Sequence, residues 1–353
     1  MFTEESILLR NHFLPHITLK NSIEFKNLYE FLKSVKPHPM NGEIIEVQGV
    51  EKTDIDVSRG AGAENIIKKT YLFEKTTLHF TLDKCNVTIQ LFSKKNNNQL
   101  VNELAKIVQY MGSLSTHSVR YLMINIYLID VKKKITPRMK KLTPNEINSG
   151  MCQRGNITTI TIYREEELRK VLIHELIHGF QYDNYEDTDK IIKHYQKKYS
   201  ISSSKINTNE AYTEIWANLI NCYLISQTPG RNNYQLFLIL IALEKEFAKF
   251  QAEKVMYLTG VDGKDVIDIN RDTNVLSYFM IRNELYEKLN LFLKLCRNNN
   301  SNYIKMEGEK EWFKFLLGKD KIKKNNRMFQ NMNKKNYIFS TMRMSLNEVR
   351  IMQ

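Results

Sequence analysis

The 353-residue chain contains only four cysteines, Cys85, Cys152, Cys222 and Cys296, and none has the close neighbour typical of a disulfide framework or a cysteine-based zinc site. We therefore expect reduced thiols. No apolar run approaches the roughly 18 residues of a membrane span, and the longest, at 236–243, predicts a core helix. The first residues lack the basic and apolar regions of a secretory signal. These absences predict a cytoplasmic protein without a membrane segment.

Histidines are also few, yet two of the eight belong to an HExxH pattern at residues 174–178. An α-helix advances 3.6 residues per turn, so His174 and His178 share a face and can bind one metal ion. Glu175 lies at the edge of that face, where a carboxylate can accept a proton from a metal-activated water. Apolar residues recur every four positions on the opposite side and predict a core face: Leu168, Leu172, Leu176 and Phe180.

A catalytic zinc needs a third protein ligand. The extended pattern HExxHxxGxxH would require glycine at Gln181 and histidine at Asn184, so the metzincin subclass is excluded. A helical pattern at 208–219 places Glu210 and Glu214 on one face. One carboxylate could bind the metal while the other accepts the free ring N–H of a ligand histidine. Their spacing leaves both assignments open.

This combination resembles the gluzincins, zinc peptidases in which a glutamate on a later helix completes HExxH, as in the lethal-factor and neurotoxin light-chain pattern. The resemblance implies that Glu210 binds the metal with His174 and His178, and that Glu214 orients His174. It also implies a zinc metallopeptidase with one catalytic Zn²⁺, which hydrolyses a protein or peptide substrate through a zinc-activated water with Glu175 as general base. The richness in Lys, Asn and Ile is similar to that of metallopeptidases of large DNA viruses, which implies host cytoplasm or virion as the location.

The surrounding pattern predicts an α+β fold. Short β-branched and aromatic runs at 121–130 and 157–163 predict strands, and 99–114 predicts a helix before them. This order is that of a zincin-like domain with a mixed sheet, a backing helix, an HExxH helix and a mostly helical C-terminal part, and the resemblance covers residues 120–290. We expect either 157–163 or 148–151 to form the sheet edge that pairs with the substrate backbone.

Three segments are predicted along the chain. Residues 1–115 form a small α+β module, in which 43–50 is a strand and 78–92 a hairpin. Residues 116–298 form the catalytic domain, and residues 299–353 a basic, helix-leaning extension.

A tyrosine or arginine is expected to stabilise the oxyanion, because the charge that develops on the substrate carbonyl needs a donor besides the metal. The helical pattern at 274–295 places Tyr278 and Arg282 one turn apart. A donor on a helix after the third ligand resembles the neurotoxin light chains, and Tyr278 is the predicted catalytic residue. Tyr212, in the glutamate helix, competes for this role.

Basic residues outnumber acidic ones by 52 to 39, which gives a formal net charge of +13. Seven basic residues and one aspartate occupy 319–335, a composition that can bind nucleic acid through counterion release. No recognised nucleic-acid motif accompanies them, and a solvent-exposed basic face accounts for the same charge. The charge therefore supports only an alternative function, a catalytically silent, zinc-stabilised protein that binds a partner or nucleic acid.

Overall fold

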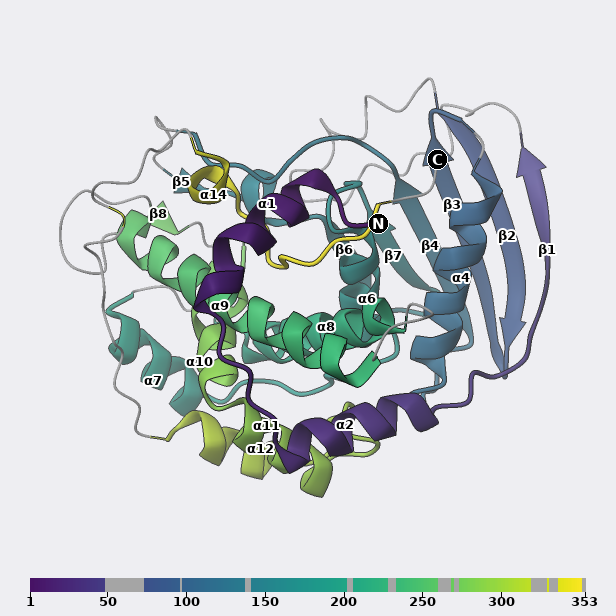
Figure 1. The fold of residues 1–353 in the computed structure, drawn as a ribbon. Helices are drawn as coiled ribbons and strands as arrows, with labels where there is room; N and C mark the ends of the chain where they lie inside the picture. Colours follow the sequence, from purple (N-terminus) through teal and green to yellow (C-terminus); the bar gives the residue numbers. More distant parts are fainter. Residues whose placement is uncertain are drawn as a thin grey trace.

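A six-stranded mixed sheet lies at one side of the molecule, and the HExxH helix packs against it (Figure 1). The computed structural model describes residues 1–47, 73–95, 97–136, 141–201, 206–227, 233–259, 268–269, 273–318, 329 and 336–350. The strands follow the order β1 (Met40–Val47), β2 (Glu74–Leu82), β3 (Cys85–Ser93), β4 (Tyr121–Tyr127), β7 (Thr158–Ile162) and β6 (Gly150–Gln153). The chain is thus α+β, as predicted.

The sheet continues across the predicted boundary at residue 115. β1, β2 and β3 form an antiparallel meander, and β3 then pairs in parallel with β4, which pairs in parallel with β7. The hairpin expected at 78–92 corresponds to β2 and β3, and the strand expected at 43–50 corresponds to β1 as far as residue 47. The N-terminal segment therefore shares one sheet with the part of the chain that carries HExxH.

The edge of the sheet next to the HExxH helix is β6, which, among the described strands, pairs with β7 alone and runs antiparallel to it. Of the two segments expected to form this edge, 157–163 does not, because β7 is paired on both sides. The other candidate, 148–151, overlaps β6. The sequence could not decide between the two segments. Which of them forms the edge depends on how β6 pairs with β7, and the pattern of neither segment alone shows this.

Helices α4 (Asn98–Gly112) and α6 (Leu168–Gly179) pack against the sheet and against each other, and α8 (Thr208–Ser226) packs on α6. α9 (Asn233–Thr259) contains the apolar run 236–243, and Phe237, Leu240 and Leu243 are fully buried there. The other described elements are α1 (Glu4–Phe13), η1 (Leu14–His16), α2 (Ile23–Ser34), β5 (Lys141–Leu142), α5 (Pro144–Ile147), α7 (Asp189–Tyr199), β8 (Asp268–Ile269), η4 (Leu276–Ile281), α10 (Arg282–Glu287), α11 (Leu289–Asn299), α12 (Glu309–Leu316) and α14 (Tyr337–Ser340).

The HExxH helix begins at Leu168, the first of the apolar residues that predicted its core face. β7 ends at Ile162, and residues 163–167 intervene before α6 begins. Glu167 precedes the helix in the left-handed region, with φ of 61°. Its buried carboxylate accepts hydrogen bonds from the backbone N–H groups of Met344 and Ser345 and pairs with Lys133. Because a left-handed glutamate is unfavourable by itself, these contacts hold the helix start in place.

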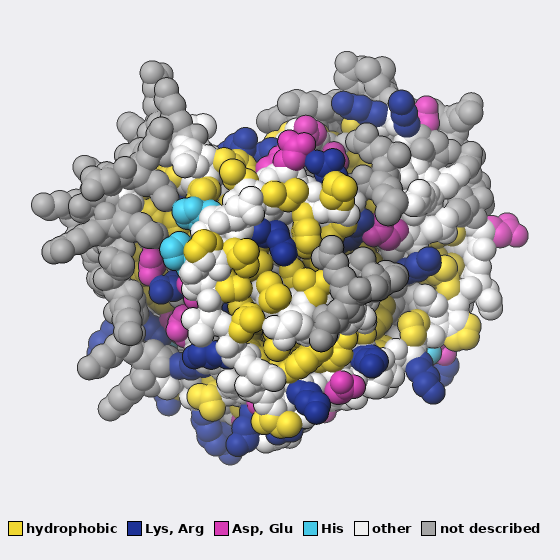
Figure 2. Space-filling view, viewed as in Figure 1, with side chains coloured by type: hydrophobic (Ala, Val, Ile, Leu, Met, Phe, Trp, Pro, Cys, Tyr) yellow, Lys and Arg dark blue, Asp and Glu magenta, His cyan; other side chains and the backbone are white. Residues whose placement is uncertain are grey.

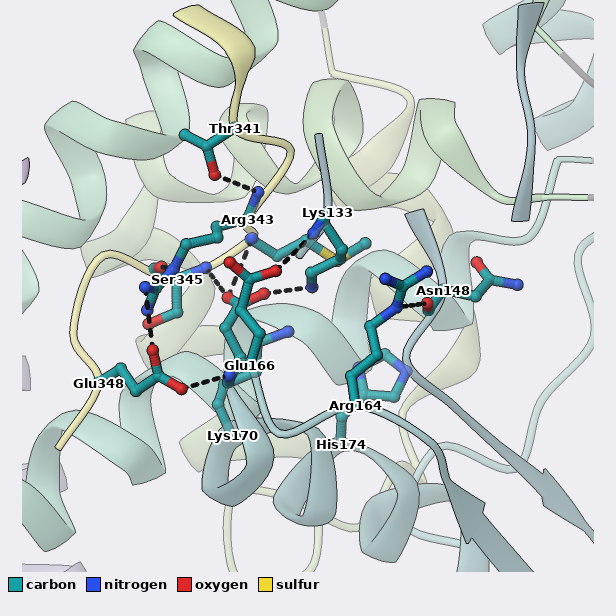
Figure 3. A network of polar contacts seen from close by, with 12 residues as sticks. Lys133, Asn148, Arg164, Glu166, Lys170, His174, Thr341, Arg343, Ser345 and Glu348 are labelled. Atoms are coloured by element: carbon teal, nitrogen blue, oxygen red, sulfur yellow. Dashed lines mark hydrogen bonds and ion pairs between the residues drawn. The ribbon is translucent and has the colours of Figure 1, made fainter. Parts of the chain in front are cut away.

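Residues 341–349 run through the interior without forming a helix, between α6, α8 and α9. Their buried side chains include Arg343 and Leu346, and Figure 3 shows Arg343, Ser345 and Glu348 in one polar network with Lys170 of α6. The predicted helix-leaning extension is thus helical at α12 and α14, whereas its last described part belongs to the core. The basic run at 319–335, except Phe329, lies outside the described residues.

On the face shown in Figure 2, lysine and arginine side chains are scattered among apolar and uncharged ones. None of the helices in the described ranges combines the length and the apolar character of a bilayer span. All four cysteines are free, and Cys85, Cys222 and Cys296 are buried.

Candidate metal centre

The two histidines of HExxH meet on one face of α6, as its helical period predicted. The Nε2 atoms of His174 and His178 lie 3.1 Å apart, and Glu210, in the first turn of α8, places its Oε2 3.3 Å from each of them. Ligand atoms of these three residues lie within 4.8 Å of one another. Packing of α8 on α6 therefore forms a site that could hold a metal ion.

Each ligand candidate has a partner that fixes its orientation. His174 Nδ1 lies 2.8 Å from Glu214 Oε2, and His178 Nδ1 lies 2.5 Å from Asp183 Oδ2. The Asn274 amide donates a 3.0 Å hydrogen bond to Glu210 Oε1. Only the second carboxylate oxygen of Glu210 is thereby turned toward the histidines.

The hydrogen-bond network assigns the tautomers of both histidines. Because the carboxylates of Glu214 and Asp183 accept, each Nδ1 carries the hydrogen, and a neutral imidazole then leaves a lone pair on Nε2. In this neutral form two nitrogen lone pairs and one carboxylate oxygen converge, an arrangement that repels unless a metal ion or a proton lies among them.

The spacing of these atoms fits zinc. Tetrahedral ligands at about 2.0–2.1 Å from zinc lie about 3.3–3.4 Å from one another. The three observed separations, from 3.1 to 3.3 Å, agree with that edge length. In addition, Glu210 Oε2 is buried without a hydrogen-bond partner in the described structure. The residues present therefore fit a zinc ion with three protein ligands.

Protons compete with a metal for the same lone pairs. Burial lowers the pKa of His174, but the carboxylates of Glu210 and Glu214 outweigh it and raise the pKa above its ordinary value. Burial also lowers the pKa of His178, but Asp183 and Glu210 outweigh it and raise this pKa well above its ordinary value. Burial favours a raised pKa at Glu210, yet the two histidines hold it well below the usual range. Metal binding is thus coupled to proton release.

Glu175 is buried next to the edge strand. Burial raises the pKa of its carboxyl group, and the two histidines oppose this effect. Gly150, the first residue of β6, approaches so closely that an added Cβ would lie 2.8 Å from Glu175 Oε1 and 3.1 Å from Val171 Cγ1. Glycine at this position therefore allows the edge strand to pass beside the carboxylate.

Glu214 occupies a different environment from Glu210. Its Oε1 lies 2.6 Å from Lys170 Nζ and 3.1 Å from Arg282 Nη1, and all three side chains are buried. Burial favours a raised pKa at Glu214, but Lys170, His174 and Arg282 lower it well below its usual range. The tertiary structure thus places Glu210 beside the Nε2 atoms and Glu214 on the far side of His174.

The three candidates for an oxyanion donor separate in space. The predicted continuous helix at 274–295 is divided into the π-helical η4, α10 and α11, and Tyr278 of η4 stacks edge-on against His174 with ring centroids 5.9 Å apart. Arg282 instead donates to Glu214 and to the Met344 carbonyl. Tyr212 donates to the Ile304 carbonyl at 2.7 Å and lies in an aromatic cluster. Only Tyr278 faces the metal centre.

Sequence reasoning missed Asp183, Asn274 and Arg154. Asp183 lies beyond the end of α6, where its Oδ1 accepts a 2.8 Å hydrogen bond from Arg154 Nη2 and its Oδ2 a 2.9 Å bond from Thr213 Oγ1. Asn274 precedes η4. Asp183 and Arg154 lie in connecting segments without a periodic pattern, and Asn274 is the first residue of the stretch predicted to be helical, where apolar spacing gives no role to a polar side chain.

In comparisons with known proteins, no protein-family model, curated protein or solved structure matches the chain.

Proposed function

We propose that this protein is a zinc-dependent metallopeptidase with a gluzincin-like ligand set of His174, His178 and Glu210. The observation that carries the proposal is the convergence of two imidazole nitrogens and one carboxylate oxygen at 3.1–3.3 Å, with a buried carboxylate, Glu175, on the same helix beside them. Among the described residues, three side chains contribute to this group. A structural zinc site is usually closed by a fourth protein ligand, whereas three ligands leave a position for water or substrate.

When bound, zinc would acidify a water molecule and polarise the peptide carbonyl. Glu175 accepts the proton of the attacking water and returns it to the leaving amine, so one carboxylate serves as base and then as acid. Tyr278 donates a hydrogen bond to the carbonyl oxygen as negative charge develops there. Burial raises the pKa of Tyr278 well above its ordinary value, which keeps the phenol protonated as a donor.

β6 supports the same proposal from the substrate side. It is a short edge strand beside α6, and an extended peptide can add to such an edge through main-chain hydrogen bonds. Because Gly150 contacts Glu175, a peptide paired with β6 would pass close to the proposed base.

The decisive variant is Glu175→Gln. It should retain zinc, because Glu175 is not among the three converging residues, and it should lower peptide cleavage by a factor of about 10² to 10⁴. Zinc content is measured by elemental analysis, and cleavage with a peptide library analysed by mass spectrometry. Glu186→Gln changes an exposed glutamate and should preserve both quantities. Unchanged cleavage in Glu175→Gln would refute the proposed mechanism.

The roles of the two glutamates are tested by a second pair of variants. Glu210→Ala should lose zinc occupancy, whereas Glu214→Ala should weaken zinc binding while leaving three ligands. Full zinc in Glu210→Ala together with its loss in Glu214→Ala would exchange the two roles.

A further inference from the structure

A small cavity opens beside the metal centre, between the start of β6 and α6. His174, Glu175 and Tyr278 line it, together with Ser149 and Gly150. Its position next to the proposed base means that a group bound there would belong to a substrate residue next to the scissile bond.

Two lysines line this cavity although they are almost completely buried. Lys133 and Lys170 are 1% and 3% exposed, and Figure 3 shows both in the polar network around the start of α6. An ammonium group has three N–H donors. Within the described part of the chain, Lys133 Nζ pairs with Glu167 and Lys170 Nζ with Glu214, one acid each. Both ammonium groups therefore retain donor capacity.

Ser149 adds a third donor. Its side chain is 5% exposed, and its Oγ has no hydrogen-bond partner among the described residues. A buried hydroxyl without a partner is costly, and it lines the same cavity as the two lysines.

The charges around the cavity favour an anion. The Lys133 and Lys170 ammonium groups repel each other. Two carboxylates, Glu175 and Glu214, also line the cavity. Glu214 is shared among Lys170, Arg282 and His174, so it does not cancel the charge of Lys170 alone, and the charge of Glu175 is opposed by the two histidines of the metal centre. A cationic or purely donating group would meet further donors here, whereas a carboxylate would accept from all of them.

The apolar part of the cavity lining suits the methylene groups that would carry such a carboxylate. Ile147, Val171 and Met344 contribute apolar surface to the lining. Methylene groups can pack on this surface while a terminal carboxylate reaches the donors.

We propose that this cavity receives a substrate carboxylate next to the scissile bond, bound by Lys133, Lys170 and the Ser149 hydroxyl. This inference rests on the proposed peptidase function. An aspartate or glutamate side chain and the C-terminal carboxylate of a short peptide carry the same chemistry.

The first experiment uses matched peptides with the zinc-loaded full-length protein. Glutamate or aspartate on either side of the scissile bond is compared with glutamine or asparagine, and each peptide is made with a free and an amidated C-terminus. We expect at least about a tenfold higher kcat/KM for the carboxylate, because hydrogen bonds to charged groups contribute strongly. Dependence on the side chain or on the free C-terminus identifies the source. Cleavage with no preference for either carboxylate would refute the inference and leave the peptidase function intact.

Ser149→Ala tests the site itself. The variant removes a hydroxyl that has no partner in the described structure, so the fold should be retained, and the preference for carboxylate over amide should fall several-fold. Ser115→Ala is the matched control, because Ser115 Oγ is also buried without a partner but lies outside the cavity. An unchanged preference in Ser149→Ala would contradict the proposed donor set.

A binding measurement separates this inference from catalysis. Butyrate should bind the wild-type protein more tightly than butyramide, which has no carboxylate, and Ser149→Ala should reduce that difference, as followed by calorimetry. If the protein cleaves no peptide but shows this difference, the peptidase function fails and the carboxylate site stands. Equal binding of both compounds would overturn the site.

Discussion

Asp183 provides the sharpest test of the metal centre, because it orients His178 without touching the proposed metal position. Its Oδ2 accepts from His178 Nδ1 at 2.5 Å and from Thr213 Oγ1 at 2.9 Å, while Oδ1 accepts from Arg154 Nη2 at 2.8 Å. Asp183→Asn preserves the shape of the side chain but replaces one acceptor oxygen with an NH₂ donor. Neither orientation of the amide satisfies all three donors.

The two orientations have different costs. If the NH₂ faces His178, the ring must accept at Nδ1 and carry its hydrogen on Nε2, which removes the lone pair turned toward His174 and Glu210. If the oxygen faces His178, the NH₂ meets the Arg154 guanidinium and that ion pair is lost. Loss of such an orienting carboxylate typically lowers metal affinity 10- to 100-fold, equivalent to about 1.4–2.7 kcal/mol. We expect a decrease in zinc affinity of this size.

The assay is a zinc titration in competition with a chromogenic chelator at fixed pH, with circular dichroism to establish that the variant is folded. Thr213→Val is the graded control, because it removes one hydrogen bond to Asp183 and leaves the acceptor of His178 in place. It should lower affinity by less than about tenfold. A folded Asp183→Asn protein with wild-type zinc affinity would show that Asp183 does not position the ligand.

Three further variants test other parts of the site. Gly150→Ala should lower kcat at least about tenfold with zinc retained, because the added Cβ would displace the Glu175 carboxylate. Steady-state kinetics and zinc analysis test this. Full activity would mean that β6 shifts and the Glu175 carboxylate keeps its place. Tyr278→Phe should lower kcat by about 10² to 10³ with little change in KM, as expected for loss of an oxyanion donor, and an unchanged kcat would remove Tyr278 from the mechanism. Asn274→Ala should weaken zinc binding about tenfold by freeing Glu210 Oε1, measured by chelator competition, whereas wild-type affinity would leave Asn274 without a positioning role.

Local periodicity predicted the site best where the relevant residues lie within one helix. His174, Glu175 and His178 are close in sequence, so the helical repeat alone placed the histidines on one face. Every strand of the sheet except β6, whose sequence has no β-branched residue, was also recognisable from its pattern. In contrast, the edge position of β6 depended on pairing with β7, and the division of 274–295 at η4 was invisible in its apolar pattern.

The sequence by itself determined which residues could form a metal centre: two histidines one turn apart, a carboxylate between them, and two glutamates on a later helix. Only the tertiary structure decided that Glu210 approaches both Nε2 atoms while Glu214 faces His174 Nδ1, because the packing of α8 on α6 sets these distances. It also brought Asp183, which follows α6, and Asn274, which precedes η4, to the ligands. Helical period operates within one element, whereas the orientation of a ligand depends on contacts between elements that are distant in the chain.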